Sequence, residues 1–485
     1  MRVRLLRCTL ALVTLSLVAV VAAPNALSAG VTPKTVNVTL SPGESTTVDK
    51  AVQTTKLPPD SDFVFLADNT GSMGPSINDV KTNAQAIIDA IEASGATNAR
   101  YGVANYQDTT QFGPCPYLFQ LNTDLTTAAG AKAAINTWSA GNGCDLPESA
   151  LYALHKVAVR DISWRADTFG ARFVIWFGDA PSHDPICNAL PDYSDATPVI
   201  TEAVSTADLV SQGIHVIAAS ALSGPGLDAD PTVGAVDYDN VCGPPDGAPG
   251  QALRITAATG GVDTVNPPAT SIAQTIINAI NALPPVPVVV TPVATCDVGL
   301  TVTNNPPSQV VPSGSTANFV ETIAVSPTVL PGTTLHCTVD FKINGASAGP
   351  DFVQTITVNV GFPPSTAGCK VTGGGRISAA NGDMATFGGN AMANGPSGQE
   401  EYQDHGPATN ANVHSLSVLS VVCSSDKTTA TIYGMATVNG GGSYVFAIDV
   451  KDLDEPGKND RYHIRLSNGY DSGDQQLVSG NIQIH

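Results

Sequence analysis

Oxygen-bearing side chains follow the first long apolar segment of the mature chain. Asp68, Thr70 and Ser72 stand at alternate positions directly after the apolar run within 62–67. A near-continuous apolar run is typical of a strand buried on both faces of a sheet. One carboxylate and two hydroxyls are hard oxygen donors, which suit a divalent cation such as Mg²⁺. The pattern predicts metal-dependent binding rather than covalent chemistry.

Two further acidic loops are placed to assist, because one such turn supplies at most three ligands. Asp145 and Glu148 flank Pro147, at the expected start of a helix, and Asp179 follows the apolar run of 172–177. In an open α/β sheet, ligands bind beyond the carboxyl ends of the strands. We therefore expect these loops to meet the first one at a single edge of the sheet.

The elements that would position these loops alternate between strand and helix patterns over 62–283. Alternation of this kind predicts a doubly wound α/β domain with a mostly parallel sheet, which we place at 58–284. Strands are expected at 62–67, 100–106, 172–177 and 214–219, with a further short strand after 260–261, and helices at 76–94, 147–159, 197–212, 251–259 and 269–283.

The rest of the chain has β character, so the predicted fold is multidomain. Short strands and turn clusters predict a β-sandwich at 285–361. The start of this region, at 284–292, is rich in Pro and Val, which is typical of a stiff linker or an edge segment. Residues 31–57 carry a strand pair that is marginal alone, so we expect it to join that sandwich. Separate packing of this arm is the alternative. Gly-rich residues 369–485 predict a C-terminal all-β domain.

The start of the chain predicts export. Three arginines precede an apolar run within 1–29, as in a secretory signal peptide, with an uncleaved signal anchor as the alternative. Removal of these arginines changes the formal net charge from −20 to −23. Such acidity argues against binding to nucleic acid. We find no later segment able to span a membrane, so the predicted location is extracellular.

Cysteine usage agrees with export. Eight cysteines remain after the signal peptide, and an even number in an exported chain predicts disulfides. Chain order and domain limits favour four pairs, of which the first two could exchange partners. The pairs are Cys115–Cys144, Cys187–Cys242, Cys296–Cys337 and Cys369–Cys423.

Four motifs together resemble a known family. In order they read DNTGSM, CDLPESALYAL, SWRAD and FVIWFGDAPSHD. They are similar to a von Willebrand A domain of the integrin beta-subunit type, over about 62–283. The resemblance implies a metal-ion-dependent adhesion site holding Mg²⁺ or Mn²⁺, whose coordination is completed by an acidic side chain of a protein partner. The implied ligands are Asp68, Thr70, Ser72, Glu148 and Asp179, with Thr70 in place of the usual Ser.

The resemblance also implies a flanking Ca²⁺ site. Asp108, Asp145, Glu148 and the carbonyl of Pro147 match its ligands, although Gly143 stands where the family has Asn. A second flanking site is predicted to be absent, because the chain has Pro-Ser after the first motif instead of an acidic pair.

The flanking parts carry weaker resemblances. Residues 36–53 resemble the strand pair that precedes the A domain in the immunoglobulin-like hybrid domain of integrin beta subunits. Residues 444–473 and 480–485 resemble a post-COAP module at the ends of exported bacterial proteins.

The predicted function is that of a secreted, metal-dependent adhesion or protein-binding module, and not an enzyme. The motifs HExxH, GxxxxGK[ST] and GxGxxG after a strand are missing. The alternatives are a structural matrix protein whose metal only stabilises loops, and a metal-dependent hydrolase.

Overall fold

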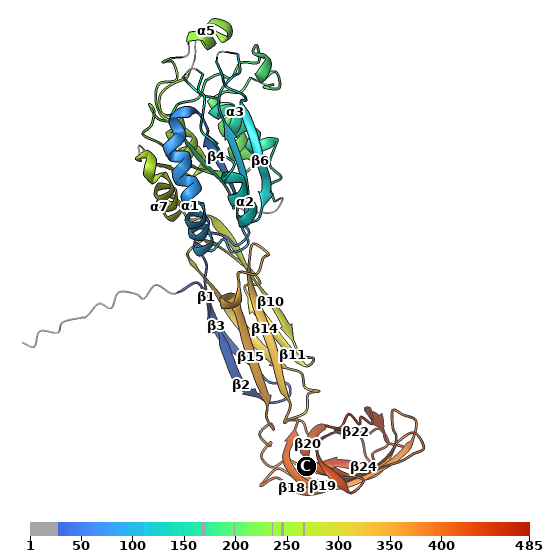
Figure 1. Ribbon diagram of the computed structural model, residues 1–485. Helices are drawn as coiled ribbons and strands as arrows, with labels where there is room; N and C mark the ends of the chain where they lie inside the picture. Colours follow the sequence, from blue (N-terminus) through green and yellow to red (C-terminus); the bar gives the residue numbers. More distant parts are fainter. Residues whose placement is uncertain are drawn as a thin grey trace, which may run out of the picture.

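The chain forms a multidomain protein with one α/β part and two β-rich parts. The computed structural model describes residues 28–111, 113–144, 146–165, 171–197, 199–234, 236–243, 247–264 and 267–485. Figure 1 shows the α/β domain, an elongated β-sandwich and the C-terminal β domain following one another along the molecule. Residues 1–27 of the expected signal peptide, and Asp145, lie outside the described residues.

The α/β domain is built on a six-stranded sheet in the order β6-β5-β4-β7-β8-β9. All neighbouring pairs are parallel except β5 and β6, which are antiparallel. The strands are β4 (Asp62–Asp68), β5 (Arg100–Tyr106), β6 (Phe119–Thr126), β7 (Arg172–Gly178), β8 (Ile214–Ser220) and β9 (Val262–Thr264). The sheet class therefore agrees with the predicted α/β domain, with an antiparallel edge strand.

Helices cover both faces of this sheet, which explains the uninterrupted apolar run of β4. Successive side chains of a strand point to opposite faces. Phe63 and Phe65 accordingly lie in one apolar cluster, and Val64 and Leu66 in another. The first cluster includes residues of α1 (Gly74–Ala93), α2 (Ala128–Ile135) and α7 (Ile272–Ala282). The second includes residues of α3 (Ala150–Val159), α4 (Glu202–Ser211) and α6 (Gln251–Thr259), and α5 (Val236–Cys242) lies near the far end of the domain (Figure 1).

Two expected helices begin later than the sequence predicted. The helix expected from 147 begins at Ala150, because Glu148 instead forms a β-bridge with Ser182. The helix expected from 197 begins at Glu202, because Ile200 bridges Ile186. The Thr201 hydroxyl then caps α4 by accepting a hydrogen bond from the Val204 N–H at 3.2 Å. The elements β6, α2 and α5 were not predicted.

The β-sandwich combines strands from before and after the α/β domain. Its sheets have the orders β1-β3-β13-β11 and β12-β10-β14-β15-β2, and their facing side chains form one apolar core. The N-terminal strands are β1 (Gly30–Thr32), β2 (Thr35–Leu40) and β3 (Ser45–Gln53). The others are β10 (Pro287–Cys296), β11 (Leu300–Asn305), β12 (Gln309–Pro312), β13 (Thr316–Val325), β14 (Thr334–Ile343) and β15 (Val353–Val360).

The sequence predicted a stiff linker or an edge segment at 284–292, and the structure shows that this segment is not a linker. Most of it belongs to β10, which lies between β12 and β14. Its pairing with β12 covers only Pro287–Val290, so Pro292 lies beyond the end of β12. A proline, which has no backbone N–H, is tolerated there because β12 does not pair with this part of β10.

The C-terminal domain is a curved nine-stranded antiparallel sheet with an apolar cluster against one face (Figure 1). Its order is β23-β22-β21-β20-β19-β18-β17-β16-β24. The strands are β16 (Lys370–Ser378), β17 (Met384–Met392), β18 (Ser397–His405), β19 (Asn410–Cys423), β20 (Thr429–Val438), β21 (Gly441–Lys451), β22 (Arg461–Leu466), β23 (Gln475–Gln476) and β24 (Ser479–Ile484).

Four disulfides connect the eight cysteines in the order that the sequence favoured. They join Cys115 to Cys144, Cys187 to Cys242, Cys296 to Cys337 and Cys369 to Cys423. Disulfides of this number are typical of exported proteins. Within the described ranges, no helix is both long and apolar enough to cross a bilayer.

Candidate metal-binding site

The carboxylates of Asp68 and Asp179 meet at the carboxyl edge of the central sheet. Asp68 is the last residue of β4, and Asp179 follows the last residue of β7. These strands are parallel neighbours in which Ala67 lies opposite Phe177, so both chains leave the sheet side by side. The sheet topology therefore positions the two carboxylates, as expected for ligand sites in open α/β sheets.

Two hydroxyls connect these carboxylates. Oδ1 of Asp68 accepts hydrogen bonds from the Thr70 N–H at 3.0 Å and the Thr70 hydroxyl at 2.7 Å. The hydroxyls of Thr70 and Ser72 are 3.3 Å apart, and Ser72 Oγ donates to Asp179 Oδ1 at 3.1 Å. Four of the five implied ligands are thus brought together in one continuous chain of contacts.

The second oxygen of each carboxylate is in an electrostatically unfavourable position. Oδ2 of Asp68 and Oδ2 of Asp179 are both buried and lack a hydrogen-bond partner among the described residues. Burial, and then the negative charge of Asp179, raise the pKa of Asp68 to about 7, against the hydrogen bonds from Thr70. Two buried like charges are costly unless a cation lies between them. The donor set of carboxylates and hydroxyls fits a hard divalent cation.

Glu148 approaches the same place from the α3 side. Its N–H donates to the Pro181 carbonyl at 2.9 Å, and its own carbonyl accepts from the His183 N–H at 3.0 Å. This backbone pairing holds Glu148 beside the loop that follows Asp179.

The buried hydroxyl of Tyr106 is affected by the charges of the three carboxylates. It accepts a hydrogen bond from Trp176 Nε1 at 2.9 Å. Burial, followed by the charges of Asp68, Glu148 and Asp179, raises the pKa of Tyr106 well above its ordinary value. The negative charges of all three acidic side chains therefore act on one buried phenol.

Two glycines allow this close packing. A Cβ on Gly178 would lie 2.6 Å from the Tyr106 hydroxyl and 3.0 Å from Cβ of Asp68. A Cβ on Gly71 would lie 2.7 Å from the carbonyl oxygen of Asn142. The distances of 2.6 and 2.7 Å are shorter than a Cβ tolerates without a shift of its neighbours, so glycine favours the close packing at both positions.

The loop around Asn142 is held over the first ligand loop. The Gly71 N–H donates to the Asn142 carbonyl at 2.7 Å, and the Gln107 amide bridges the carbonyls of Asn69 and Gly141 at 2.9 Å each. The Cys115–Cys144 disulfide fixes the same loop from its other end. Sequence analysis missed Gln107, whose amide carries no metal-ligand signal.

Asp108, the implied ligand of the flanking Ca²⁺ site, has several protein partners. Its Oδ1 accepts from the Ser149 hydroxyl at 3.0 Å and the Tyr193 hydroxyl at 3.3 Å. His183 Nε2 lies 3.2 Å from the same oxygen, and its ring stacks on Tyr238 with centroids 3.8 Å apart. Asp108 Oδ1 is thus engaged within the protein, and the second site stays a prediction.

The geometry of the first site depends on hydroxyl ligands. In the described part of the chain, no group of three or more His, Cys, Asp and Glu side chains is arranged to hold a metal ion. Any ion would be held by two close carboxylates and two hydroxyls, with Glu148 nearby. Pro147 lies next to Glu148 and is buried.

Among the hollows that the described residues line outside this site are two that contain ionisable side chains. One, of about 530 Å³, is lined among others by Tyr117, Phe119 and Lys156 beside edge strand β6. Tyr117 connects it to the ligand loop, because its hydroxyl accepts a hydrogen bond from Asn69 at 3.1 Å.

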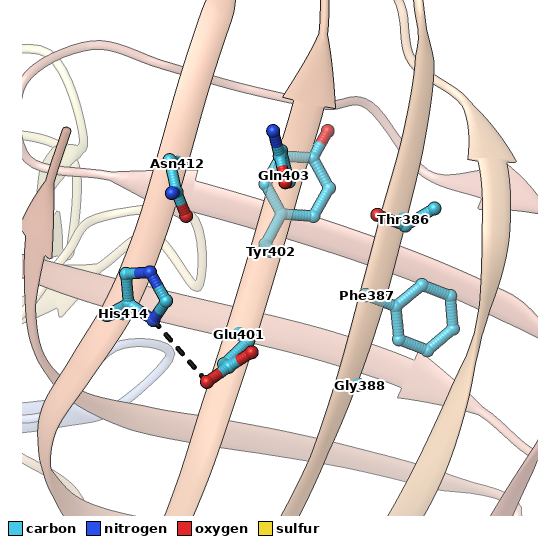
Figure 2. Close-up of a pocket in the computed structure, with 8 residues that line it drawn as sticks. All are labelled: Thr386, Phe387, Gly388, Glu401, Tyr402, Gln403, Asn412 and His414. Atoms are coloured by element: carbon cyan, nitrogen blue, oxygen red, sulfur yellow. Dashed lines mark ion pairs between the residues drawn. The ribbon is translucent and has the colours of Figure 1, made fainter.

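The other hollow, of about 310 Å³, lies on strands β17, β18 and β19 of the C-terminal domain. Figure 2 shows Glu401 and His414 across it, 3.4 Å apart at their nearest charged atoms. Both side chains are exposed to solvent, so this hollow is an open surface feature.

Comparison with known proteins gives distant structural similarities only. No model of a protein family matches the chain, and no curated protein matches it. A von Willebrand factor type A protein from Catenulispora acidiphila is similar at 12% identity, covering 70% of this chain and 76% of its own, with a TM-score of 0.30. The ArnB paralog VWA2 from Sulfolobus acidocaldarius is similar at 12% identity, covering 66% and 72%, with a TM-score of 0.25.

The pilus adhesin SpaC from Lactobacillus rhamnosus GG, in its open conformation, is similar at 10% identity, covering 92% of this chain and 82% of its own, with a TM-score of 0.32. Overlaps at this level do not decide the function. The fold is defined by the strand order and the helices described above.

Proposed function

We propose that the chain is an exported protein-binding module of the adhesion type, which recognises an acidic side chain of a partner protein through a divalent cation. The observation that carries this proposal is the pair of buried oxygens, Asp68 Oδ2 and Asp179 Oδ2, with no hydrogen-bond partner among the described residues. Ser72 keeps the two carboxylates close through its hydroxyl. Mg²⁺ or Mn²⁺ fits this donor set.

The chain's own residues prepare this site for binding rather than for turnover. Thr70 and Ser72 contribute neutral oxygens, so the site holds fewer negative charges than an all-carboxylate cage. When bound, a Mg²⁺ ion retains positions that water or a partner carboxylate occupies. Gly71 and Gly178 allow the surrounding loops to approach closely, and the Cys115–Cys144 disulfide fixes the rim.

The same proposal treats the chain as a binder and not an enzyme. The closest histidine, His183, lies against Asp108 and stacks on Tyr238, so its ring is committed to internal contacts. A hydrolytic reaction would need a general base placed at the ion. The proposed partner is a protein, because the net charge of −20 disfavours nucleic acid.

Calorimetric titration with Mg²⁺, Mn²⁺ and Ca²⁺ tests the proposal on the full mature chain. The variants are Asp68→Ala and Asp179→Asn, and Asp89→Asn on the exposed side of α1 is the matched control. We expect one saturable site in the wild type and the control, lost in both site variants. No heat of binding at millimolar metal in the wild type would refute the metal-dependent mechanism.

Binding to proteins is then tested with the same set. A partner retained by the wild type and by Asp89→Asn, and released by chelator or by Asp179→Asn, would establish recognition through the ion. Metal binding that raises the melting temperature without changing any interaction would instead favour a matrix protein whose metal stabilises loops.

A further inference from the structure

The core of the β-sandwich contains three polar side chains that the proposed binding site does not use. Lys50 lies on β3, Glu321 on β13 and Gln354 on β15, so the first two come from one sheet and the third from the facing sheet. Their exposed fractions are 2%, 0% and 0%. They are enclosed by the apolar cluster that fills the sandwich. We refer to them as the sandwich triad.

The three groups converge on one oxygen atom. Lys50 Nζ lies 3.2 Å from Glu321 Oε2, and Gln354 Nε2 donates a hydrogen bond to the same oxygen at 2.9 Å. The amine and the amide are therefore both in contact with one carboxylate oxygen, which can exchange protons with either of them.

This cluster is costly as a set of separate side chains. Lys50 Nζ has only Glu321 as an ion-pair partner among the described residues, and Oε1 of Glu321 and Oε1 of Gln354 are buried there without a hydrogen-bond partner. Buried polar atoms without partners are strongly destabilising, and a buried ion pair recovers this cost only with good additional hydrogen bonds.

Burial also changes the chemistry of the amine. It lowers the pKa of Lys50, while the charge and the hydrogen bond of Glu321 act in the opposite direction. Desolvation favours the neutral amine, which is the nucleophilic form of lysine. A neutral amine and a carboxamide that both contact one carboxyl group are the components of an amide exchange reaction.

We propose that the sandwich triad is a covalent modification site, in which Lys50 and Gln354 become joined by an intramolecular amide bond with Glu321 as the catalytic acid and base. Lys50 Nζ attacks Cδ of Gln354, so that the Nζ–Cδ bond forms and the Cδ–Nε2 bond breaks. Glu321 takes a proton from Nζ and delivers a proton to the leaving Nε2, which departs as ammonia. The reaction needs no oxidant, cofactor or second enzyme.

The crosslink would change how the protein bears load. It connects the two facing sheets through the core, and it ties the N-terminal strand β3 to the last sandwich strand, β15. The whole α/β domain lies between these strands in sequence. The amide bond would therefore enclose this domain in a covalently closed loop of the chain. Such a ring restricts the unfolded chain, as a disulfide does, but resists reduction.

Peptide mapping of the purified wild-type protein tests this directly. The disulfides are reduced and alkylated, and the chain is digested by a protease that does not cleave at lysine. We expect the segments containing Lys50 and Gln354 to remain joined, with a mass lower than their sum by one ammonia. This measurement needs no variant and is independent of where the signal peptide is cleaved.

Three variants and one control define the reacting groups. Lys50→Met and Gln354→Leu should give separate peptides, and Glu321→Gln should give mostly separate peptides from folded protein. The control is Lys34→Met, because Lys34 forms an exposed ion pair with Asp351, 2.8 Å apart, in the same sandwich. It should leave the crosslink intact.

Two results would overturn the proposal. Separate, unmodified peptides from the wild type would show that the sandwich triad is an ordinary buried ion pair. Peptides containing Lys50 and Glu321 that are joined with the loss of one water would show that Lys50 reacts with the carboxyl group of Glu321 and not with the amide of Gln354. Neither result would bear on the metal site, because the triad lies in a different domain.

Discussion

Replacement of Asp68 by Asn should separate the electrostatic cost of the metal site from its function. Asp68 is fully buried beside Asp179, and its pKa is raised from 3.8 to about 7, by burial first and by Asp179 second. A carboxyl with a raised pKa binds its proton more tightly in the folded state. The metal-free protein therefore loses stability as the pH rises from about 4 to 7, and the loss is complete above 7.

The size of this effect follows from the shift. One pKa unit corresponds to about 1.4 kcal/mol, so the penalty on the free energy of unfolding of the metal-free wild type is at most about 4 kcal/mol at pH 8. Asn retains the oxygen that accepts from Thr70 but carries no charge. In chelator at pH 8, Asp68→Asn should therefore be more stable than the wild type, and the difference should vanish near pH 4.

Metal should reduce this difference in stability. A ligand at one hundred times its dissociation constant stabilises the folded state by about 2.7 kcal/mol. The wild type should gain this stability on addition of Mg²⁺, whereas Asp68→Asn should gain none. A variant with higher stability in chelator and no response to metal is the signature of a residue retained for binding.

The assay can report on the α/β domain alone. The three tryptophans of the chain, Trp138, Trp164 and Trp176, all lie in this domain. Urea unfolding followed by tryptophan fluorescence, with chelator or Mg²⁺ between pH 4 and 8, therefore measures the relevant transition. If Asp68→Asn is less stable than the wild type in chelator at pH 8, the carboxylate is stabilised by its hydrogen bonds, and the inferred repulsion is wrong.

Three further predictions concern other buried positions. Burial raises the pKa of Glu400 in the C-terminal sheet to about 8. Glu400→Gln should therefore stabilise that domain relative to the wild type as the pH rises from about 5 to 8, by at most about 5 kcal/mol. Calorimetry, with the exposed Glu401→Gln as the control, measures this difference. Gly178→Ala should destabilise the α/β domain by about 1–3 kcal/mol through contact with Tyr106 and Asp68, whereas Gly141→Ala, with open space around its Cβ, should not; urea titration of both gives the comparison, and equal midpoints would contradict the packing argument. Asp62→Ala should cost about 2–3 kcal/mol, because buried Asp62 accepts two hydrogen bonds from the Arg100 side chain at 3.1 and 2.9 Å and one from the Arg165 N–H at 2.9 Å; an unchanged unfolding midpoint by fluorescence would show that solvent replaces these contacts.

The central sheet was predictable because burial on both faces leaves a distinct pattern. The apolar run before Asp68 is typical of a strand covered on both sides, and the end of such a strand is where ligands bind. The α/β class follows from these runs. The contact between Ser72 and Asp179 could not be derived from the pattern, since it depends on the side-by-side register of β4 and β7.

Elements with weak patterns were missed for physical reasons. Strand β6 is an edge strand whose residues are partly exposed, so it lacks the apolar run of its neighbours. Helix α3 starts after Glu148 because the backbone of Glu148 pairs with that of Ser182, a long-range contact that local propensity does not report. Strand β10 contains Pro292, which lies beyond the end of its pairing with β12. In each case a tertiary partner decided the outcome.

The sandwich triad illustrates a signal that the sequence does contain. In a strand, alternate residues share a face, so a polar residue between two inward apolar residues is itself directed inward. Lys50 stands between Val48 and Val52 in this way, and Glu321 between Phe319 and Ile323. A charged residue in phase with the core is expensive to bury alone, so two such residues of opposite charge on paired strands predict a contact. The same reasoning applies to Asp68, whose burial is costly unless a cation accompanies it. In both places, a buried charged side chain indicates a candidate site of binding or reaction.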